Sequence, residues 1–280
     1  MSTDFEGNDY LINFDIINTP IIGEFSNDIL INFDIFTAPV IGEVSNDTLI
    51  NFDIFTAPIN YVLPVPIFGT EGDDTLIGGD GNYYLFGQGG NDTLINTNGS
   101  VDGGAGNDTL KADYSSLKNG AGIHVGYLGY NSIFSRRDGS VLLNYRDIER
   151  FEITGTQYND QLWGINGDDL LNGNDGDDSL VGGFGNDTLI GGSGADTFIF
   201  NSMFEGGDII KDFNRMEGDK IQIFRGGFNN ININFGSSPI DFNTFSYDKT
   251  SGGLFYSGIQ FATLENKPAD FAVDKDILFI

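Results

Sequence analysis

Glycine-rich polar segments and short apolar segments alternate through much of this chain in blocks of nine residues. Three blocks lie end to end in 69–95, reading GTEGDDTLI, GGDGNYYLF and GQGGNDTLI, and five more fill 155–199. Their shared frame is G-x-x-G-x-D-x-U-x, where U is apolar. Because successive strand residues point to opposite faces, the triplet x-U-x predicts a very short strand with one inward side chain. Glycine at the first and fourth positions suits a tight turn with positive φ.

Two blocks in succession predict one full turn of a flattened coil, made of loop, strand, loop and strand. Stacked turns then bring together residues about 18 apart, with parallel strands. The apolar positions should form two facing ladders in the core. One ladder contains Leu162, Leu180 and Phe198, and the facing ladder contains Leu171 and Leu189.

The aspartate at the sixth position follows the same spacing, so the stacked turns should align carboxylates along both edges of the coil. In the second array, Asp160, Asp178 and Asp196 share one edge, and Asp169 and Asp187 share the other. In the first array, Asp74 lies next to Asp92, and Asp108 follows after a shortened turn. Two unit charges ~4 Å apart repel by roughly 4 kcal/mol at an effective dielectric constant of ~20.

A hard divalent cation between the turns would remove this repulsion. Calcium takes six to eight oxygen ligands, and a loop offers backbone carbonyls beside the aspartate. Cysteine is absent and His124 is the only histidine, so zinc and copper are poor candidates. A simpler interpretation is that Asp and Asn merely suit turns. Turn chemistry, however, does not require Asp at one position of so many blocks.

These blocks resemble the RTX (haemolysin-type) calcium-binding repeats, over 69–111 and 155–199. The resemblance implies an all-β, right-handed parallel β-roll with several Ca²⁺ ions between successive loops of one edge. It assigns ligand roles to the sixth-position aspartates and to carbonyl oxygens of the same loops. In one block Tyr83 replaces the aspartate, so we expect no site there.

A second repeat, 19 residues long, occupies 1–68, which we interpret as an N-terminal extension of the roll. NDYLINFDIINTPIIGEFS begins at Asn8, and related copies begin at Asn27 and Asn46. GEFSNDILI and GEVSNDTLI fit the nonapeptide frame, with Gly23 and Gly42 at the first position. The fit predicts further calcium-binding carboxylates at Asp9, Asp28 and Asp47. The alternative is an extended linker punctuated by proline.

The remaining segments interrupt or end the repeats. Residues 112–154 separate the block 69–111 from the block 155–200 and predict a non-repeat β spacer. Residues 201–280 predict a C-terminal β cap, with a hairpin turning at 251–253. There Asp208 and Asp212 either add a calcium ion or cap the stack. The final residues, DILFI, resemble the uncleaved signal for type I export in this family.

The charge balance limits the partners. Asp and Glu number 41 against 13 Lys and Arg, a net charge of −28. This charge argues against binding to nucleic acid or to anionic membranes. The hydrophobic fraction of 39% argues against disorder. The start of the sequence shows no ordinary signal peptide, and no apolar run approaches the length of a membrane span. Together with the resemblance to a type I export signal, these features imply a secreted extracellular or cell-surface protein without membrane insertion.

The sequence contains neither the HExxH motif of metalloproteases nor the G-x-S-x-G motif of lipases. We predict a non-catalytic structural protein that assembles with other copies of itself through the N-terminal repeats. The alternative is a small calcium-dependent adhesin or glycan-binding module on the cell surface. Rows of outward threonine would favour the adhesin, but we expect Thr48, Thr75 and Thr93 to share their column with Tyr10, Ile29 and Ser179. An enzyme of another type is the third reading.

Overall fold

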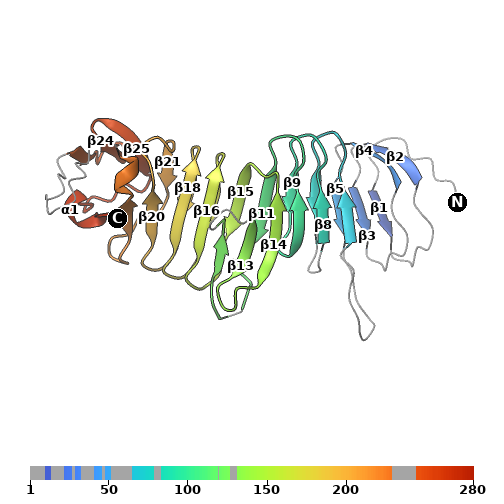
Figure 1. Ribbon diagram of the computed structural model, residues 1–280, viewed down its shortest axis with the longest axis horizontal. Coiled ribbons are helices and arrows are strands. Elements are labelled where there is room, and N and C mark those ends of the chain that lie inside the picture. The colour runs from blue at the N-terminus through green and yellow to red at the C-terminus, as the bar shows by residue number, and fades with distance from the viewer. Residues whose placement is uncertain are drawn as a thin grey trace. The chain divides into compact units, whose positions relative to one another are not determined.

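The computed structural model describes residues 10–13, 22–26, 29–32, 41–45, 48–51, 65–78, 83–118, 120–126, 131–228 and 244–280. Up to Val65 it describes the backbone only. The chain divides into two compact units, the first made of Met1–Ala112 and Leu142–Glu149 and the second of Asp113–Val141 and Arg150–Ile280. Both are built almost entirely from short parallel strands, so the predicted all-β parallel roll is confirmed (Figure 1).

In unit 1, consecutive strands from β6 onward alternate between two sheets. One sheet contains, in spatial order, β1 (Tyr10–Asn13), β3 (Ile29–Asn32), β5 (Thr48–Asn51), β7 (Thr75–Ile77), β9 (Thr93–Ile95) and β11 (Thr109–Asp113). The other contains β6 (Val65–Phe68), β8 (Tyr83–Phe86), β10 (Gly99–Asp102) and β14 (Val141–Arg146). A separate parallel pair is formed by β2 (Ile22–Ser26) and β4 (Ile41–Ser45).

The core of unit 1 is a ladder of apolar side chains on each sheet. Leu76, Leu94 and Leu110 pair in register and are almost fully buried. On the facing sheet the ladder is formed by Ile67, Leu85, Val101 and Tyr145. Each strand therefore contributes its central residue to the core, as the x-U-x triplet predicts.

The 19-residue repeats continue the sheet of β7, since β1, β3 and β5 pair in parallel up to it. One detail of the sequence interpretation is wrong. Gly23 and Gly42, expected at the first position of a turn, lie inside β2 and β4. The nonapeptide frame does not apply here, because a turn of 19 residues places its second strand differently. Asp9, Asp28 and Asp47 lie outside the described residues.

Unit 2 repeats the architecture with longer arrays. One sheet contains β15 (Arg150–Thr154), β17 (Leu170–Asn172), β19 (Thr188–Ile190), β21 (Asp208–Ile210), β25 (Ile259–Leu264), β24 (Gly253–Tyr256) and β23 (Phe245–Tyr247). The facing sheet contains β26 (Ile277–Phe279), β22 (Lys220–Ile223), β20 (Thr197–Phe200), β18 (Ser179–Phe184), β16 (Gln161–Asn166), β12 (Ile123–Val125) and β13 (Ser132–Ser135). The pairs are parallel except β12 with β13, β23 with β24, and β24 with β25.

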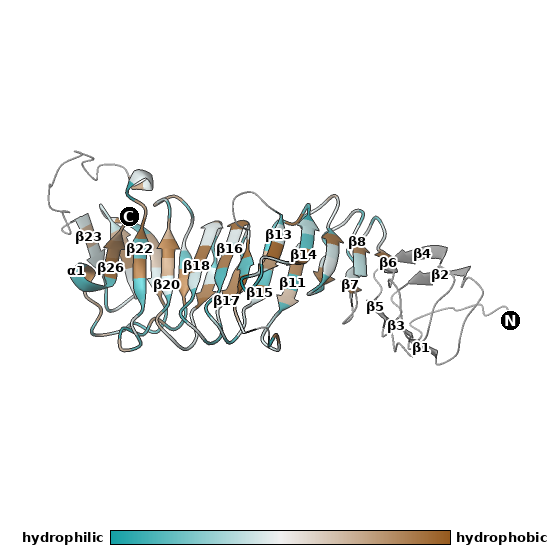
Figure 2. Ribbon diagram, turned by 60° about the horizontal axis from the view of Figure 1, so that its bottom comes forward, coloured by the Kyte–Doolittle hydropathy of each residue, from teal (hydrophilic) through white to brown (hydrophobic). Residues whose placement is uncertain are grey.

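Both predicted core ladders of unit 2 are confirmed. Leu162 pairs with Leu180 and Leu180 with Phe198, while Leu171 pairs with Leu189 on the facing sheet. All five side chains have no exposed surface. Hydrophobic and hydrophilic residues alternate along the strands of this unit in Figure 2, as expected when one face of each sheet covers the core.

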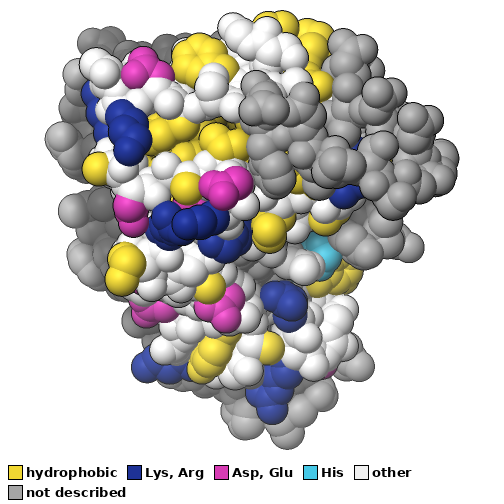
Figure 3. Space-filling view, turned by 90° about the vertical axis from the view of Figure 1, so that its left-hand side faces the viewer, with side chains coloured by type: hydrophobic (Ala, Val, Ile, Leu, Met, Phe, Trp, Pro, Cys, Tyr) yellow, Lys and Arg dark blue, Asp and Glu magenta, His cyan; other side chains and the backbone are white. Residues whose placement is uncertain are grey.

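The end of unit 2 has its own small core of aromatic rings. Phe228 contacts Phe245, Tyr256 and Phe261 with ring centroids 5.3–6.0 Å apart. A 3₁₀ turn (Arg225–Gly227) precedes Phe228, and the short helix α1 (Val273–Asp276) leads into β26. Figure 3 views the molecule from this side and shows Lys and Arg side chains next to acidic and hydrophobic ones. The predicted hairpin is confirmed, since β23 and β24 pair antiparallel around 248–252.

The expected column of threonines needs one correction. Thr48, Thr75 and Thr93 pair in register with Thr109, in the sheet that also contains Tyr10 and Ile29. Ser179 pairs with Gln161 and Thr197 in a sheet of unit 2 and does not belong to this column. The position within a block does not by itself identify the sheet, because the strands of consecutive blocks alternate between two sheets.

Candidate functional site

The sixth-position aspartates form hydrogen-bonded ladders along the edges of both rolls. One carboxylate oxygen, Oδ1, accepts a hydrogen bond of 2.7–3.1 Å from the backbone N–H of the aspartate one turn earlier. These contacts join Asp74 to Asp92, Asp92 to Asp108, Asp160 to Asp178, Asp178 to Asp196, Asp169 to Asp187, and Asp187 to Asp208. The side chains are at most 5% exposed. The predicted stacking on two edges is therefore present.

The second oxygen of most of these carboxylates is buried and has no hydrogen-bond partner among the described residues. This holds for Oδ2 of Asp92, Asp108, Asp169, Asp178, Asp187 and Asp196. Burying an ionised oxygen without a partner is costly, because the protein then replaces none of the hydration that the charge loses. A feature repeated at six equivalent positions indicates a site for a cation rather than six separate defects.

A small cradle lies beside each of these oxygens, next to the first glycine of the loop. A Cβ atom on Gly173 would lie 2.0 Å from Asp178 Oδ2 and 2.5 Å from the carbonyl oxygen of Gly191, one turn later. The same convergence of a carboxylate and a carbonyl occurs beside Gly87 and Gly164. Only glycine leaves this position open.

The donor set fits a hard divalent cation. Within the described part of the chain, no three His, Cys, Asp or Glu side chains form a metal-binding cluster. The cradles beside Gly87, Gly164 and Gly173 instead combine one carboxylate with a backbone carbonyl oxygen, and calcium accepts such mixed oxygen ligands. No Lys or Arg occurs within the repeats of the second array, although Arg136 and Arg150, which precede them, favour the charged forms of Asp160 and Asp169.

The pKa values of the ladder aspartates also indicate a cation site. Burial, with a smaller contribution from neighbouring aspartates, raises the pKa of Asp169 and of Asp178 to about 8. Burial also raises the pKa of Asp160, but only to about 6, since hydrogen bonds from Ile123 and Thr156 stabilise its charged form. Without a cation the stacked carboxylates favour protonation, so protons and a metal ion compete for the same oxygens.

A second ladder runs along the outside of the same loops, at the fifth position. Here a side-chain oxygen accepts from the backbone N–H one turn later, opposite in direction to the aspartate ladder. Examples are Asp73 with Asn91, Asn159 with Asp177, and Asp177 with Ala195. These residues carry no ligand role in our prediction. Their contacts explain why Asn and Asp recur before the sixth position.

Sequence reasoning missed two carboxylates that continue the ladder outside the repeats. In unit 1, Glu149 Oε2 accepts from Asp108 N at 2.8 Å, and the carbonyl oxygen of Asp147 lies 2.0 Å from the Cβ position of Gly103. No signal in the nonapeptide frame indicates Glu149, which lies 41 residues after its partner. In unit 2, Asp219 Oδ1 accepts from Asp196 N at 3.0 Å. The repeated Gly-Asp pairs at 207–208 and 218–219 could have indicated Asp219.

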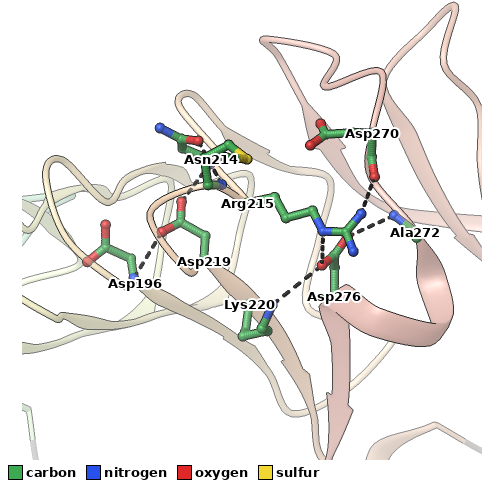
Figure 4. A network of polar contacts seen from close by, with 9 residues as sticks. Asp196, Asn214, Arg215, Asp219, Lys220, Asp270, Ala272 and Asp276 are labelled. Atoms are coloured by element: carbon green, nitrogen blue, oxygen red, sulfur yellow. Dashed lines mark hydrogen bonds and ion pairs between the residues drawn. The ribbon is translucent and has the colours of Figure 1, made fainter.

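Beyond the last turn, a polar network surrounds Asp219 and the fully buried Asp276 (Figure 4). Asp219 Oδ2 accepts from Asn214 N, while Arg215 and Lys220 form ion pairs with Asp276 at 3.3 and 3.4 Å. Asp212 accepts from the backbone N–H groups of Gly191 and Gly192. It therefore binds the loop 191–196, and the two roles that the sequence left open for it, calcium ligand and cap, stay predictions.

The remaining predicted positions are placed as follows. Asp208 continues the edge of Asp187, and Tyr83 lies buried where its block lacks the aspartate. Asp74 and Asp160 belong to the ladders, but Thr70 and Thr156 occupy their second oxygens. The ligand role of each aspartate stays a prediction.

Four segments match the family described as RTX calcium-binding nonapeptide repeat, at residues 67–94, 95–113, 152–180 and 163–198. The chain contains RTX calcium-binding repeats. Such repeats bind Ca²⁺ at multiple sites, so calcium is the cation that the cradles fit. The matched RTX segments cover about a third of the chain and coincide with the described turns.

No curated protein sequence matches the chain. Among solved structures, it is similar to the extracellular lipase LipA from Serratia marcescens, with 22% identity and a TM-score of 0.26. The match covers 79% of this chain and 41% of the lipase, so the chain spans less than half the length of that protein. Among the described residues, no helix has the length and apolar character needed to cross a membrane.

The cradle can be tested by filling it. We expect Gly173→Ala to abolish one calcium site and to destabilise the calcium-loaded protein by about 1–3 kcal/mol, because its methyl group overlaps Asp178 Oδ2. Gly72→Ala is the matched control, since the nearest atom to its Cβ lies 3.8 Å away and its φ is not positive. Calorimetric calcium titration and urea unfolding measure both effects. Equal behaviour of the two variants would contradict the assignment.

Proposed function

We propose that this protein is a secreted, non-catalytic calcium-binding roll that folds when calcium fills its edges. One observation carries the proposal: along each edge, buried carboxylates lie in a row with one oxygen bound to the neighbouring turn and the other open toward a cradle. The charge repulsion that opposes this stack is removed by the cation, and the cation links consecutive turns.

The energetic scale supports coupling of folding to calcium. Extracellular calcium sites typically have dissociation constants of about 10⁻⁴–10⁻³ M. An ion present at about one hundred times its dissociation constant stabilises the folded state by about 2.7 kcal/mol per site. Several such sites together exceed a typical total stability of roughly 5–15 kcal/mol. The protein should therefore depend on calcium for its fold.

The same reasoning supports an extracellular location. Sites of this affinity remain empty at the low free calcium of the cytosol, so the chain would leave the cell unfolded and fold outside. Its last residues, which resemble a type I export signal, form β26 in the folded protein, with Ile277 buried and paired to Ile221. We propose that this segment is exposed before folding and enters the sheet afterwards.

Two adjacent aspartates allow a matched test. Asp178 lies in the buried ladder, whereas Asp177 belongs to the outer ladder, and the change to Asn is chemically identical at both. We expect Asp178→Asn to raise the calcium concentration at half-folding, because a tenfold loss of affinity at one site removes about 1.4 kcal/mol of binding. Asp177→Asn should leave it unchanged. Circular dichroism during calcium titration, starting in chelator, measures both.

Wild-type spectra that are identical with chelator and with saturating calcium would refute calcium-dependent folding. A common shift in both variants would instead show that the buried ladder has no special role.

We propose in addition that the folded protein associates with further copies of itself. In unit 1 the sheet has β1 at one edge, and no strand pairs with its outer side among the described residues. An exposed strand edge is a template for pairing with another chain. We expect calcium-dependent filaments or sheets in electron microscopy. Monomers alone at millimolar calcium would exclude this assembly.

A glycan-binding role is the second candidate. Thr48, Thr75, Thr93 and Thr109 form an in-register column, and the last three are partly exposed. A regular row of hydroxyl groups is a plausible surface for a repetitive polymer. Binding to a glycan array that disappears in Thr93→Val would favour this role, and an array without hits would remove it.

A further inference from the structure

The loops that carry the sixth-position aspartates occur in two conformations. In six loops, both the second and the fourth residue have positive φ, as in 173–178, where Asn174 has φ 78° and Gly176 has φ 123°. The other members are 87–92, 103–108, 164–169, 182–187 and 191–196. In the loops 69–74 and 155–160, no residue has positive φ.

This division coincides with the state of the carboxylates. The six loops with positive φ are the six whose aspartate has a buried Oδ2 without a hydrogen-bond partner among the described residues. Asp74 and Asp160, in the other two loops, have no such oxygen. A carboxylate and a carbonyl oxygen converge beside Gly69 and Gly155 as well, so the two kinds of loop differ in whether Oδ2 already has a hydrogen-bond donor.

Threonine at the second position accounts for the closed loops. Thr70 N and Oγ1 lie 2.6 and 2.8 Å from Asp74 Oδ2. Thr156 repeats the arrangement, with its N 2.5 Å from Asp160 Oδ2 and its hydroxyl within 3.2 Å of both carboxylate oxygens. Branching at Cβ is not the cause, since the β-branched Ile165 has φ 85° at the same position of an open loop. What distinguishes threonine is its hydroxyl group, which bonds to the carboxylate together with the backbone N–H of the same residue.

The next turn adds a second donor at the same gap. Gln88, which stacks on Thr70, donates its side-chain N–H to the carbonyl oxygen of Gly69. Asn174, which stacks on Thr156, donates from Nδ2 to the carbonyl oxygen of Thr156 at 2.9 Å. In both units, a carboxamide thus bonds a carbonyl oxygen of the threonine loop. The carboxylate and this carbonyl oxygen already have N–H or O–H donors.

We propose that Thr70 and Thr156, with Gln88 and Asn174, replace a calcium ion in the first gap of one edge of each roll. Hydrogen-bond donors stabilise an ionised carboxylate in place of a cation. Calcium then fills only the gaps whose aspartate lies in a loop with positive φ. This narrows the predicted ligand set, leaving Asp74 and Asp160 as carboxylates held by hydrogen bonds. The proposal rests on the calcium-binding function proposed above.

Counting bound ions tests the proposal. Thr70→Gly gives the loop 69–74 the sequence of an open repeat, since Gly72 is already in place. We expect native mass spectrometry at saturating calcium to show one more ion per chain in Thr70→Gly than in the wild type. Thr70→Ser keeps the hydroxyl group and should leave the count unchanged. Asp178→Asn should lower the count.

The outcomes are distinguishable. A folded Thr70→Gly variant with the wild-type count would overturn the role of threonine, as would a lower count in Asp74→Asn with an unchanged circular dichroism spectrum. Wild-type protein without bound calcium would overturn the proposed function itself. If Thr70→Gly does not fold, Thr156→Gly combined with Tyr158→Gly makes the same change in unit 2. The same gain of one ion is expected there.

Discussion

The hydrogen bond between an aspartate carboxylate and the backbone N–H of the neighbouring turn determines how the turns stack in both units. It fixes the register of the turns, because each sixth-position Oδ1 binds one particular amide. It also aligns like charges along the edges of the second array, whose repeats contain no Lys or Arg. Every other feature of the edges, from the open glycine positions to the unpartnered Oδ2 atoms, follows from the need to compensate that row of charge.

The groups that compensate the negative charge of the carboxylates are different where the repeats stop. Of the 13 Lys and Arg residues, seven lie between residues 211 and 275 and none lies before residue 111. At the end of unit 2, Arg215 and Lys220 pair with Asp276, and Asp212 binds the last loop. Protein cations thus act at the terminal turns, whereas the interior turns contain the open carboxylates for which we propose calcium.

Periodicity alone was sufficient to predict the roll, its two core ladders and the alternation of aspartates between edges. These features depend only on spacing, as Leu162, Leu180 and Phe198 illustrate. The state of each carboxylate was not predictable in this way. It depends on the backbone conformation of the residue two places into the loop, and on partners such as Glu149 that lie outside any repeat. The frame also failed where turns have 19 residues.

The alternation of strands between two sheets restricts how such a chain can change in length. Insertion of one nonapeptide would move every later strand to the opposite sheet and every later carboxylate to the opposite edge. Insertion of two would add a complete turn and leave the rest in place. Small irregularities are absorbed within loops, since ladder partners lie 16, 18, 21 or 23 residues apart. Rolls of this kind should therefore grow and shrink by duplication or deletion of paired blocks.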